Sequence, residues 1–231
     1  MCGKNQPDLA SGYLKKRGDT LKHVMFDIDD TLVQSYDLDS ECFIQAVKEV
    51  TGLDIDTNWS RYEHVTDSGI LNQFFKEKNI ENTELIFAQI KRVFLSKIQT
   101  RITNNPILEI PGSRKFISSL KEMDNVVISL ATGGWYESAI LKLESAGIDI
   151  SNIFIASAND HYSRIEIMKI AEKRAVKEES LSFTYFGDGC WDLKACKELG
   201  VNFVLVGNKL EHSQSIMDFK KQREVIDYIG L

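Results

Sequence analysis

Short apolar runs alternate with amphipathic helical patterns along most of the chain. In the second half, helical periodicity fills the intervals between the runs, as in the helix predicted from about Arg164 to Ala175. Strands separated by helices usually pair in parallel through right-handed crossovers. The pattern therefore predicts an α/β fold with a Rossmann-like, mostly parallel sheet of five or more strands. The apolar runs lie at residues 24–26, 126–131, 153–158, 183–187 and 201–207.

The interval between the first two runs differs, because it contains helical patterns alone. A first helix is expected to be capped by Asp39 or Ser40 and to end at Gly52. Two further helical patterns centre on residues 70–75 and 85–98, the second after a cap at Asn82 or Thr83.

Prolines mark the point where the strand-helix alternation begins. Pro106 and the pair Pro111-Gly112 follow the last of these helices. We therefore expect an all-helical domain at residues 36–107, inserted into an α/β core of residues 1–35 and 108–231. Within that core, residues 1–20 lack periodicity and are expected to be loosely ordered.

Composition and charge favour a small-molecule partner. The chain has 231 residues, 43% of them hydrophobic, with a net charge of −6. This excludes disorder as the default and offers no basic surface for nucleic acid or an anionic membrane. No apolar run approaches the roughly 20 residues of a spanning helix. No secretory signal is evident either, so a cytoplasmic location is expected.

The four cysteines show no metal-ligand spacing. Cys2, Cys42, Cys190 and Cys196 are expected to be reduced thiols. Because acidic neighbours disfavour a thiolate, we expect Cys190 to be a small buried residue rather than a nucleophile.

An acidic cluster directly follows the first apolar run. Asp27, Asp29 and Asp30 stand where a buried strand ends. The carboxyl ends of parallel strands face the crevice in which ligands of open α/β sheets bind. The simpler alternative is a solvated acidic turn.

Other predicted strand ends carry complementary groups. Thr132 precedes Gly133 and a second glycine, which offers a hydroxyl and free backbone amides to an oxyanion. Arg164 stands at a helix start, where the helix dipole disfavours a cation unless an anion is bound nearby. Asp188 and Asp192 follow another strand. The simpler alternatives are that the Thr-Gly-Gly sequence is a turn and that Asp192 caps the helix that follows it.

Together these groups suit phosphoryl transfer. Asp27 and Asp188 can hold Mg²⁺, while Arg164 and Thr132 stabilise the equatorial oxygens of the phosphoryl group. Asp27 can attack phosphorus, and Asp29 can protonate the leaving oxygen and then activate water. The side chain of Asp29 is then expected to lie away from the metal.

These motifs resemble, in order, those of the haloacid dehalogenase superfamily of phosphohydrolases. The run from Asp27 to Thr31 is similar to its first motif, Thr132 to its second, and the run from Gly187 to Asp192 to its fourth. The resemblance implies that Asp27, the backbone carbonyl of Asp29, and Asp188 bind Mg²⁺, with Asp192 in support. Thr132, Gly133 and Arg164 would bind phosphate. The helical insert resembles the cap of the phosphoglycolate-phosphatase-like branch.

The third motif departs from the commonest pattern, which has a lysine. Ser163 and Arg164 stand there, and Lys169 lies more than one helical turn beyond. We assign the role to Arg164 and expect Lys169 to be an exposed helix residue.

A polar loop in the helical insert is the candidate for substrate contacts. Its side chains can reach over a bound substrate, although a helix-capping loop is the simpler interpretation. The candidates are Arg61, His64, Thr66 and Ser68.

The leading hypothesis is a Mg²⁺-dependent phosphatase acting on a small phosphorylated metabolite. Asp29 argues against dehalogenation, because that reaction has no alkoxide to protonate. A phosphosugar mutase keeps both acids and remains an alternative. A catalytically silent binding module is the third hypothesis.

Overall fold

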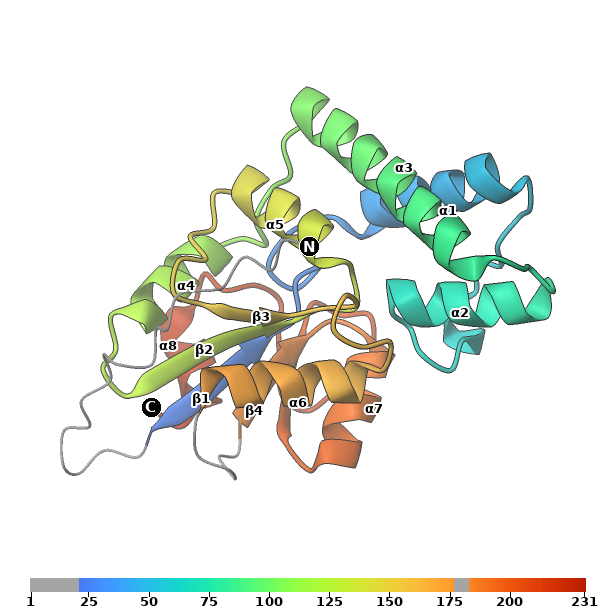
Figure 1. Ribbon diagram of the computed structural model, residues 1–231. Helices are drawn as coiled ribbons and strands as arrows, with labels where there is room; N and C mark the ends of the chain where they lie inside the picture. Colours follow the sequence, from blue (N-terminus) through green and yellow to red (C-terminus); the bar gives the residue numbers. More distant parts are fainter. Residues whose placement is uncertain (1–20, 177–182) are drawn as a thin grey trace.

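Six parallel strands form one sheet in the computed structural model, which describes residues 21–176 and 183–231 (Figure 1). The strand order is β3-β2-β1-β4-β5-β6, and each neighbouring pair is parallel. The predicted α/β class is confirmed, with one short strand beyond the five apolar runs. The expectation for residues 1–20 lies outside the described residues. The strands are β1 (Lys22–Phe26), β2 (Val126–Ala131), β3 (Phe154–Ala156), β4 (Phe183–Gly187), β5 (Asn202–Val206) and β6 (Ser215–Ile216).

Strand β1 lies inside the sheet, between β2 and β4, and helices cover both of its faces. Phe26 belongs to the apolar core on one face and Met25 to the core on the other. Both side chains are fully buried, which explains why this strand is a continuous apolar run. Helices α4 (Ser113–Lys121), α5 (Tyr136–Ser145) and α8 (Gln222–Asp227) pack on the Phe26 side, and α6 (Arg164–Ala175) and α7 (Cys190–Leu199) on the Met25 side.

A separate group of helices, here called the helical block, follows β1 and has a core of its own. Its buried aromatic side chains include Phe43, Phe74 and Phe94. Trp135, from the loop after β2, inserts its ring among them, 5.3 Å from Phe94 and 5.9 Å from Phe43 between centroids. Figure 1 shows the block beside the layered α/β part. The block comprises α1 (Tyr36–Thr51), the 3-10 turn η2 (Trp59–Arg61), α2 (Asp67–Glu77) and α3 (Thr83–Asn104).

The first helix of the block begins earlier than its sequence pattern indicates. Ser35 is the N-cap of α1, and the backbone amide of Asp39 already donates to the Ser35 carbonyl at 2.8 Å. The cap predicted at Asp39 or Ser40 is therefore wrong, and Asp39 belongs to the first helical turn. The predicted end is confirmed, since Gly52 adopts a left-handed conformation with φ of 71°.

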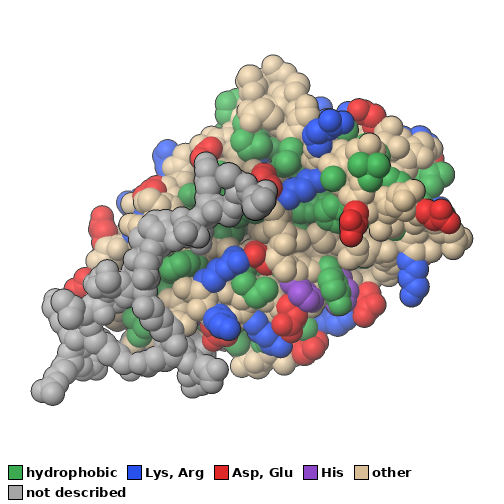
Figure 2. Space-filling view, in the orientation of Figure 1, with side chains coloured by type: hydrophobic (Ala, Val, Ile, Leu, Met, Phe, Trp, Pro, Cys, Tyr) green, Lys and Arg blue, Asp and Glu red, His purple; other side chains and the backbone are tan. Residues whose placement is uncertain are grey.

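The surface carries charges of both signs. On the face shown in Figure 2, basic and acidic side chains of the described residues are interspersed. None of the helices in the described ranges combines the length and apolarity that crossing a bilayer requires.

The described cysteines Cys42, Cys190 and Cys196 are free thiols. The expectation that Cys190 is buried is wrong. It occupies the exposed first position of α7, whereas Asp192 and Cys196 lie on the buried side of that helix.

Candidate active site

A cleft of about 90 Å³ lies where the carboxyl ends of the strands meet the helical block. The loops after β1, β2 and β4 and the start of α6 provide its core side, and α1 and α2 provide much of the opposite side. Its polar lining includes Asp27, Asp29, Thr132, Arg164 and Asp188 from the core, and Tyr36, Asp39, Ser40, Thr66 and Asp67 from the block.

Asp27 directly follows strand β1, whose last four residues are buried, and lines this cleft. Its backbone amide donates to the carbonyl of Phe186 at 2.9 Å, so the residue is held against the end of β4. Burial and the nearby carboxylate of Asp192 raise the pKa of Asp27, and Arg164 partly offsets this rise. A second cation near Asp27 would therefore favour its anionic form.

Arg164 contacts three polar side chains through one nitrogen. Its Nη1 lies 3.2 Å from Asp27 Oδ1, 2.7 Å from Asp192 Oδ1 and 3.2 Å from the Tyr185 hydroxyl. Its Nε is buried and has no partner among the described residues. A Cβ on Gly133 would lie 2.6 Å from Arg164 Nη2 and 3.0 Å from the Val65 carbonyl oxygen, so a larger residue here would displace the guanidinium group. The guanidinium group thus keeps one unpaired N–H group in a residue that lines the cleft.

Lys169 has no part in this arrangement. Its ammonium pairs with Glu166 at 2.8 Å, and about half of its side chain is exposed. The expectation that Lys169 is an exposed helix residue is confirmed.

Three carboxylates form the group best suited to a metal. Asp27, Asp188 and Asp192 each place an oxygen within 4.8 Å of the others. Asp188 also contacts Lys209 at 2.5 Å, and Asp192 accepts from Gly189 at 3.0 Å as a helix cap. Burial and the Asp192 carboxylate raise the pKa of Asp188 to about 7. Hard oxygen donors that repel one another fit Mg²⁺.

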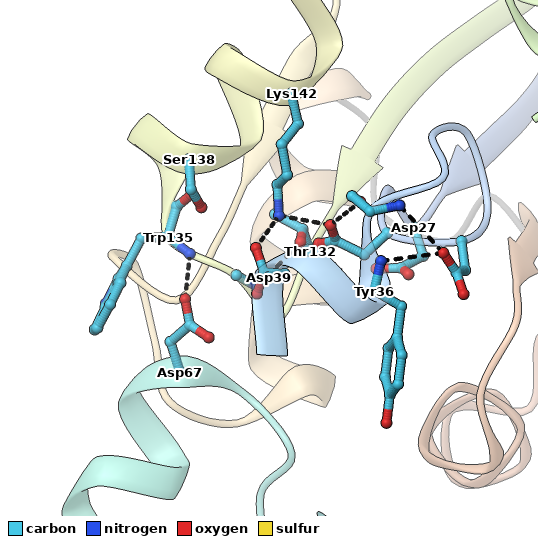
Figure 3. A network of polar contacts seen from close by, with 12 residues as sticks. Asp27, Tyr36, Asp39, Asp67, Thr132, Trp135, Ser138 and Lys142 are labelled. Carbon is cyan, nitrogen blue, oxygen red and sulfur yellow. Dashed lines mark hydrogen bonds and ion pairs between the residues drawn. The ribbon is translucent and has the colours of Figure 1, made fainter. Parts of the chain in front are cut away.

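Asp29 lies outside this carboxylate group, and its side chain makes hydrogen bonds with other residues. Its Oδ1 accepts from Lys142 Nζ at 2.5 Å and from the Ser35 hydroxyl. Lys142 also donates to Asp39 at 2.6 Å (Figure 3). Sequence reasoning missed Lys142 and Asp39. The available signal was the helical position of Lys142, which shares a buried stripe with Ala139 and Leu143.

Thr132 and the glycines after it form a turn beside Asp29. Thr132 Oγ1 accepts from the Gly134 amide at 3.0 Å. A Cβ on Gly134 would lie 3.5 Å from Thr132 Oγ1 and 3.6 Å from Asp29 Oδ2, so these two oxygens flank the same point. The turn therefore places a hydroxyl close to the second acid.

The four candidate substrate residues lie in different environments. Arg61 pairs with Asp56 at 2.7 Å and with Glu77, away from the cleft lining. His64 packs against the Tyr162 ring.

The other two candidates join the block to the core. Thr66 lines the cleft, caps α2 through the Gly69 amide and donates to the Tyr162 carbonyl at 2.6 Å. Ser68 donates to the Ala158 carbonyl at 2.7 Å. The capping alternative therefore holds for Thr66.

Asp67, between them, extends this attachment. Its carboxylate accepts from the Trp135 amide at 2.8 Å (Figure 3). The backbone amide of Asp67 donates to the Gly133 carbonyl at 2.8 Å. The start of α2 is thus bound to the loop that carries Thr132.

The cleft combines an acid at the end of β1, an arginine with a spare donor and a cation-binding carboxylate group. A second acid lies close by in a different hydrogen-bonding environment. Such a set can bind a phosphoryl group and supply both a nucleophile and a proton carrier.

Comparison with known proteins shows a family match over most of the chain. Residues 24–206 match the family model described as haloacid dehalogenase-like hydrolase. A search of curated proteins finds no match. Among solved structures, a β-phosphoglucomutase from Clostridium difficile is 18% identical with a TM-score of 0.71, and the match covers 91% of this chain and 98% of that one.

Two further solved structures show the same fold. A hydrolase from Pseudomonas syringae is 17% identical with a TM-score of 0.69, with 90% of this chain and 98% of that one covered. CbbY from Rhodobacter sphaeroides in complex with phosphate is 14% identical with a TM-score of 0.67, with 87% and 96% covered.

Proposed function

The chain belongs to the haloacid dehalogenase-like hydrolases, and from this premise we propose that it is a Mg²⁺-dependent phosphatase. It hydrolyses a small phosphorylated metabolite through an aspartyl-phosphate intermediate. The helical block, residues 36–107, acts as a cap over the α/β core. CbbY, a protein of similar fold, has been solved in complex with phosphate, which supports a phosphorylated substrate.

One observation carries this proposal. Asp27 contacts Arg164, whose Nε is buried without a partner in the described chain, and both line the cleft that contains Asp29. A nucleophile, an anion-binding donor and a second acid thus lie within one small space. The size of the cleft and its aromatic walls, including Tyr36 and Phe43, favour a compact substrate.

The proposed reaction has two steps. In the first, an Asp27 oxygen attacks phosphorus, the ester P–O bond breaks, and the proton of Asp29 passes to the leaving oxygen. In the second, Asp29 takes a proton from water as the water oxygen attacks phosphorus, and the bond between Asp27 and phosphorus breaks. Inorganic phosphate leaves, and Asp29 is again protonated.

The carboxylate group accounts for the metal requirement. Asp27, Asp188 and the backbone carbonyl of Asp29 would hold Mg²⁺, with Asp192 supporting the site. The ion offsets the repulsion between an anionic carboxylate and the phosphate. Arg164, Thr132 and the Gly133 amide bind the phosphoryl oxygens.

Phosphate release by the purified full-length chain tests the proposal. With Mg²⁺, we expect turnover of p-nitrophenyl phosphate and of members of a phosphorylated-metabolite panel, and loss of turnover with chelator. Asp27→Asn should reduce kcat/KM by at least about 10³-fold, because the amide is a poor nucleophile. Asp149→Asn, a matched change at an exposed aspartate outside the cleft, should retain activity.

Other outcomes would change the proposed function or the role proposed for Asp27. Activity that survives in Asp27→Asn would remove this residue as nucleophile. Isomerisation of a sugar phosphate in excess of phosphate release would identify a phosphosugar mutase. Absence of turnover across the panel would favour a binding module.

A further inference from the structure

Lys142 is a fully buried lysine, although it belongs to an otherwise ordinary amphipathic helix. Its side chain has no exposed surface, and Nζ lies between two carboxylates, 2.5 Å from Asp29 Oδ1 and 2.6 Å from Asp39 Oδ1. Burial alone would lower the pKa of Lys142, but Asp29 and Asp39 together raise it, so the side chain stays cationic. Burying an ammonium is costly unless it is paired in this way, so its placement constrains both carboxylates.

The two carboxylate oxygens of Asp29 have different surroundings. Oδ1 accepts from both Lys142 and Ser35. Oδ2 has no hydrogen-bond partner among the described residues and lies beside the turn that contains Thr132. One oxygen is therefore anchored, and the other is directed to the side where a phosphoryl oxygen would bind.

The contacts around Asp29 Oδ1 and Lys142 involve both parts of the molecule, the α/β core and the helical block. Lys142 comes from α5 of the core, whereas Asp39 belongs to the first turn of α1 in the helical block. Ser35 is the N-cap of that same helix. Figure 3 shows Lys142 extending from α5 toward Asp39. A shift of the start of α1 would thus disturb one donor to Asp29 Oδ1, Ser35, directly and the other, Lys142, through its contact with Asp39.

We propose that Lys142 is a positioning residue that orients Asp29 for proton transfer and, through Asp39, makes this orientation depend on the position of α1. This role rests on the proposed phosphatase reaction. Lys142 itself does not touch the substrate, since it does not line the cleft. It acts by fixing one Asp29 oxygen so that the other meets the leaving group.

The dependence of rate on the leaving group tests this role. An alkyl oxide must be protonated as it leaves, whereas p-nitrophenolate leaves without help. In Lys142→Met, kcat/KM for an alkyl phosphate such as glycerol 2-phosphate should fall about 10²-fold, the usual contribution of a general acid. For p-nitrophenyl phosphate it should change by less than about fivefold. The parameter kcat/KM is used because it reports the steps up to release of the alcohol.

Matched variants separate positioning from structural damage. Asp29→Asn should show the same selective loss, and Lys142→Arg should restore part of the alkyl phosphate activity. Lys121→Met removes a lysine that pairs with Asp149 outside the cleft and should leave both rates unchanged. If Lys142→Met does not fold, Lys142→Gln combined with Asp39→Asn removes one charge of each sign and should show the same selective loss.

Two results would overturn the inference. One is an equal loss on both substrates in a folded Lys142 variant, which indicates general damage to the site. The other is an unchanged rate on the alkyl phosphate. If the wild-type protein is active, either result leaves the phosphatase assignment intact. An inactive wild-type protein would contradict the phosphatase assignment itself.

Discussion

Two groups of charged side chains lie near the end of the first strand, and they are built differently. The strand-end cluster contains Asp27, Asp188 and Asp192, whose oxygens approach one another within 4.8 Å. The helix-bridging cluster contains Asp29 and Asp39, with the Lys142 ammonium between them. In the first group, Arg164 and Lys209 contact the carboxylates, yet the three carboxylates remain close enough to share a further cation. In the second group, one fully buried lysine lies between the two carboxylates.

This difference indicates what each group can do. Carboxylates that face one another are stabilised by a cation placed among them, so the strand-end cluster is suited to a ligand. Carboxylates joined through a buried lysine are suited to holding a geometry. The strand-end cluster also belongs entirely to the α/β core, whereas the helix-bridging cluster needs Asp39 of the helical block.

Removing Arg164, which contacts two carboxylates of the strand-end cluster, should have a large effect on activity. Arg164→Ala should reduce kcat/KM about 10²- to 10³-fold, because it deletes a donor to the phosphoryl oxygens. Lys169→Ala should change kcat/KM by less than about twofold, since this residue makes only an exposed ion pair. Phosphate release measures both, with circular dichroism as the check on folding. The opposite ranking would transfer the phosphate-binding role to Lys169.

The effect of Mg²⁺ on the free energy of unfolding should show which of the two clusters binds the metal. At a Mg²⁺ concentration 100 times its Kd, binding should stabilise the protein by about 2.7 kcal/mol. Asp188→Asn should abolish this gain in urea denaturation, whereas Asp39→Asn should retain it. Loss of the gain in Asp39→Asn alone would place the metal at the helix-bridging cluster.

The opposite end of β1 contains a buried titratable residue that lies away from both clusters. His23 is buried there, 2.8 Å from the Ser129 hydroxyl, and burial lowers its pKa to about 4. Between pH 6.5 and 4 the unfolded chain therefore binds more protons at this residue than the folded chain, so stability falls as the pH is lowered. From pH 7 to 5 the loss should be about 2 kcal/mol.

Urea denaturation of wild type and His23→Gln at both pH values measures this contribution. The variant should lose less stability than wild type over the same interval. Its activity at pH 7 should remain close to that of wild type, because His23 lies outside the cleft lining. Equal pH dependence in the two proteins would show that His23 stays neutral in both states.

Much of the fold could be predicted because buried parallel strands are continuous apolar runs. The run at residues 126–131 coincides with β2, and the helix predicted from Arg164 to Ala175 coincides with α6. Strand β6 could not be found in this way, because it consists only of Ser215 and Ile216. The start of α1 was misplaced because its first turn contains polar residues that are equally typical of a preceding loop.

The site residues could be predicted only where they directly follow a strand. Asp27, Thr132 and Asp188 stand directly after apolar runs, and parallel pairing brings them to one edge. Their catalytic roles remain predictions. Lys142 stands in a helix, where a lysine usually faces water, and its partner Asp29 is 113 residues away. Only the folded chain, in which α5 lies beside the loop after β1, reveals that pair.

Trp135 limits how the helical block can move. Its indole comes from the core loop but is completely buried among Phe43, Phe87 and Phe94 of the block. Lifting the block away as a rigid body would expose an aromatic side chain of about 150–250 Å², at a cost of about 4–6 kcal/mol. Fewer than about one molecule in a thousand would then be fully open at equilibrium. Substrate entry is therefore expected to use a smaller rotation of the block, with the indole as a pivot that stays covered.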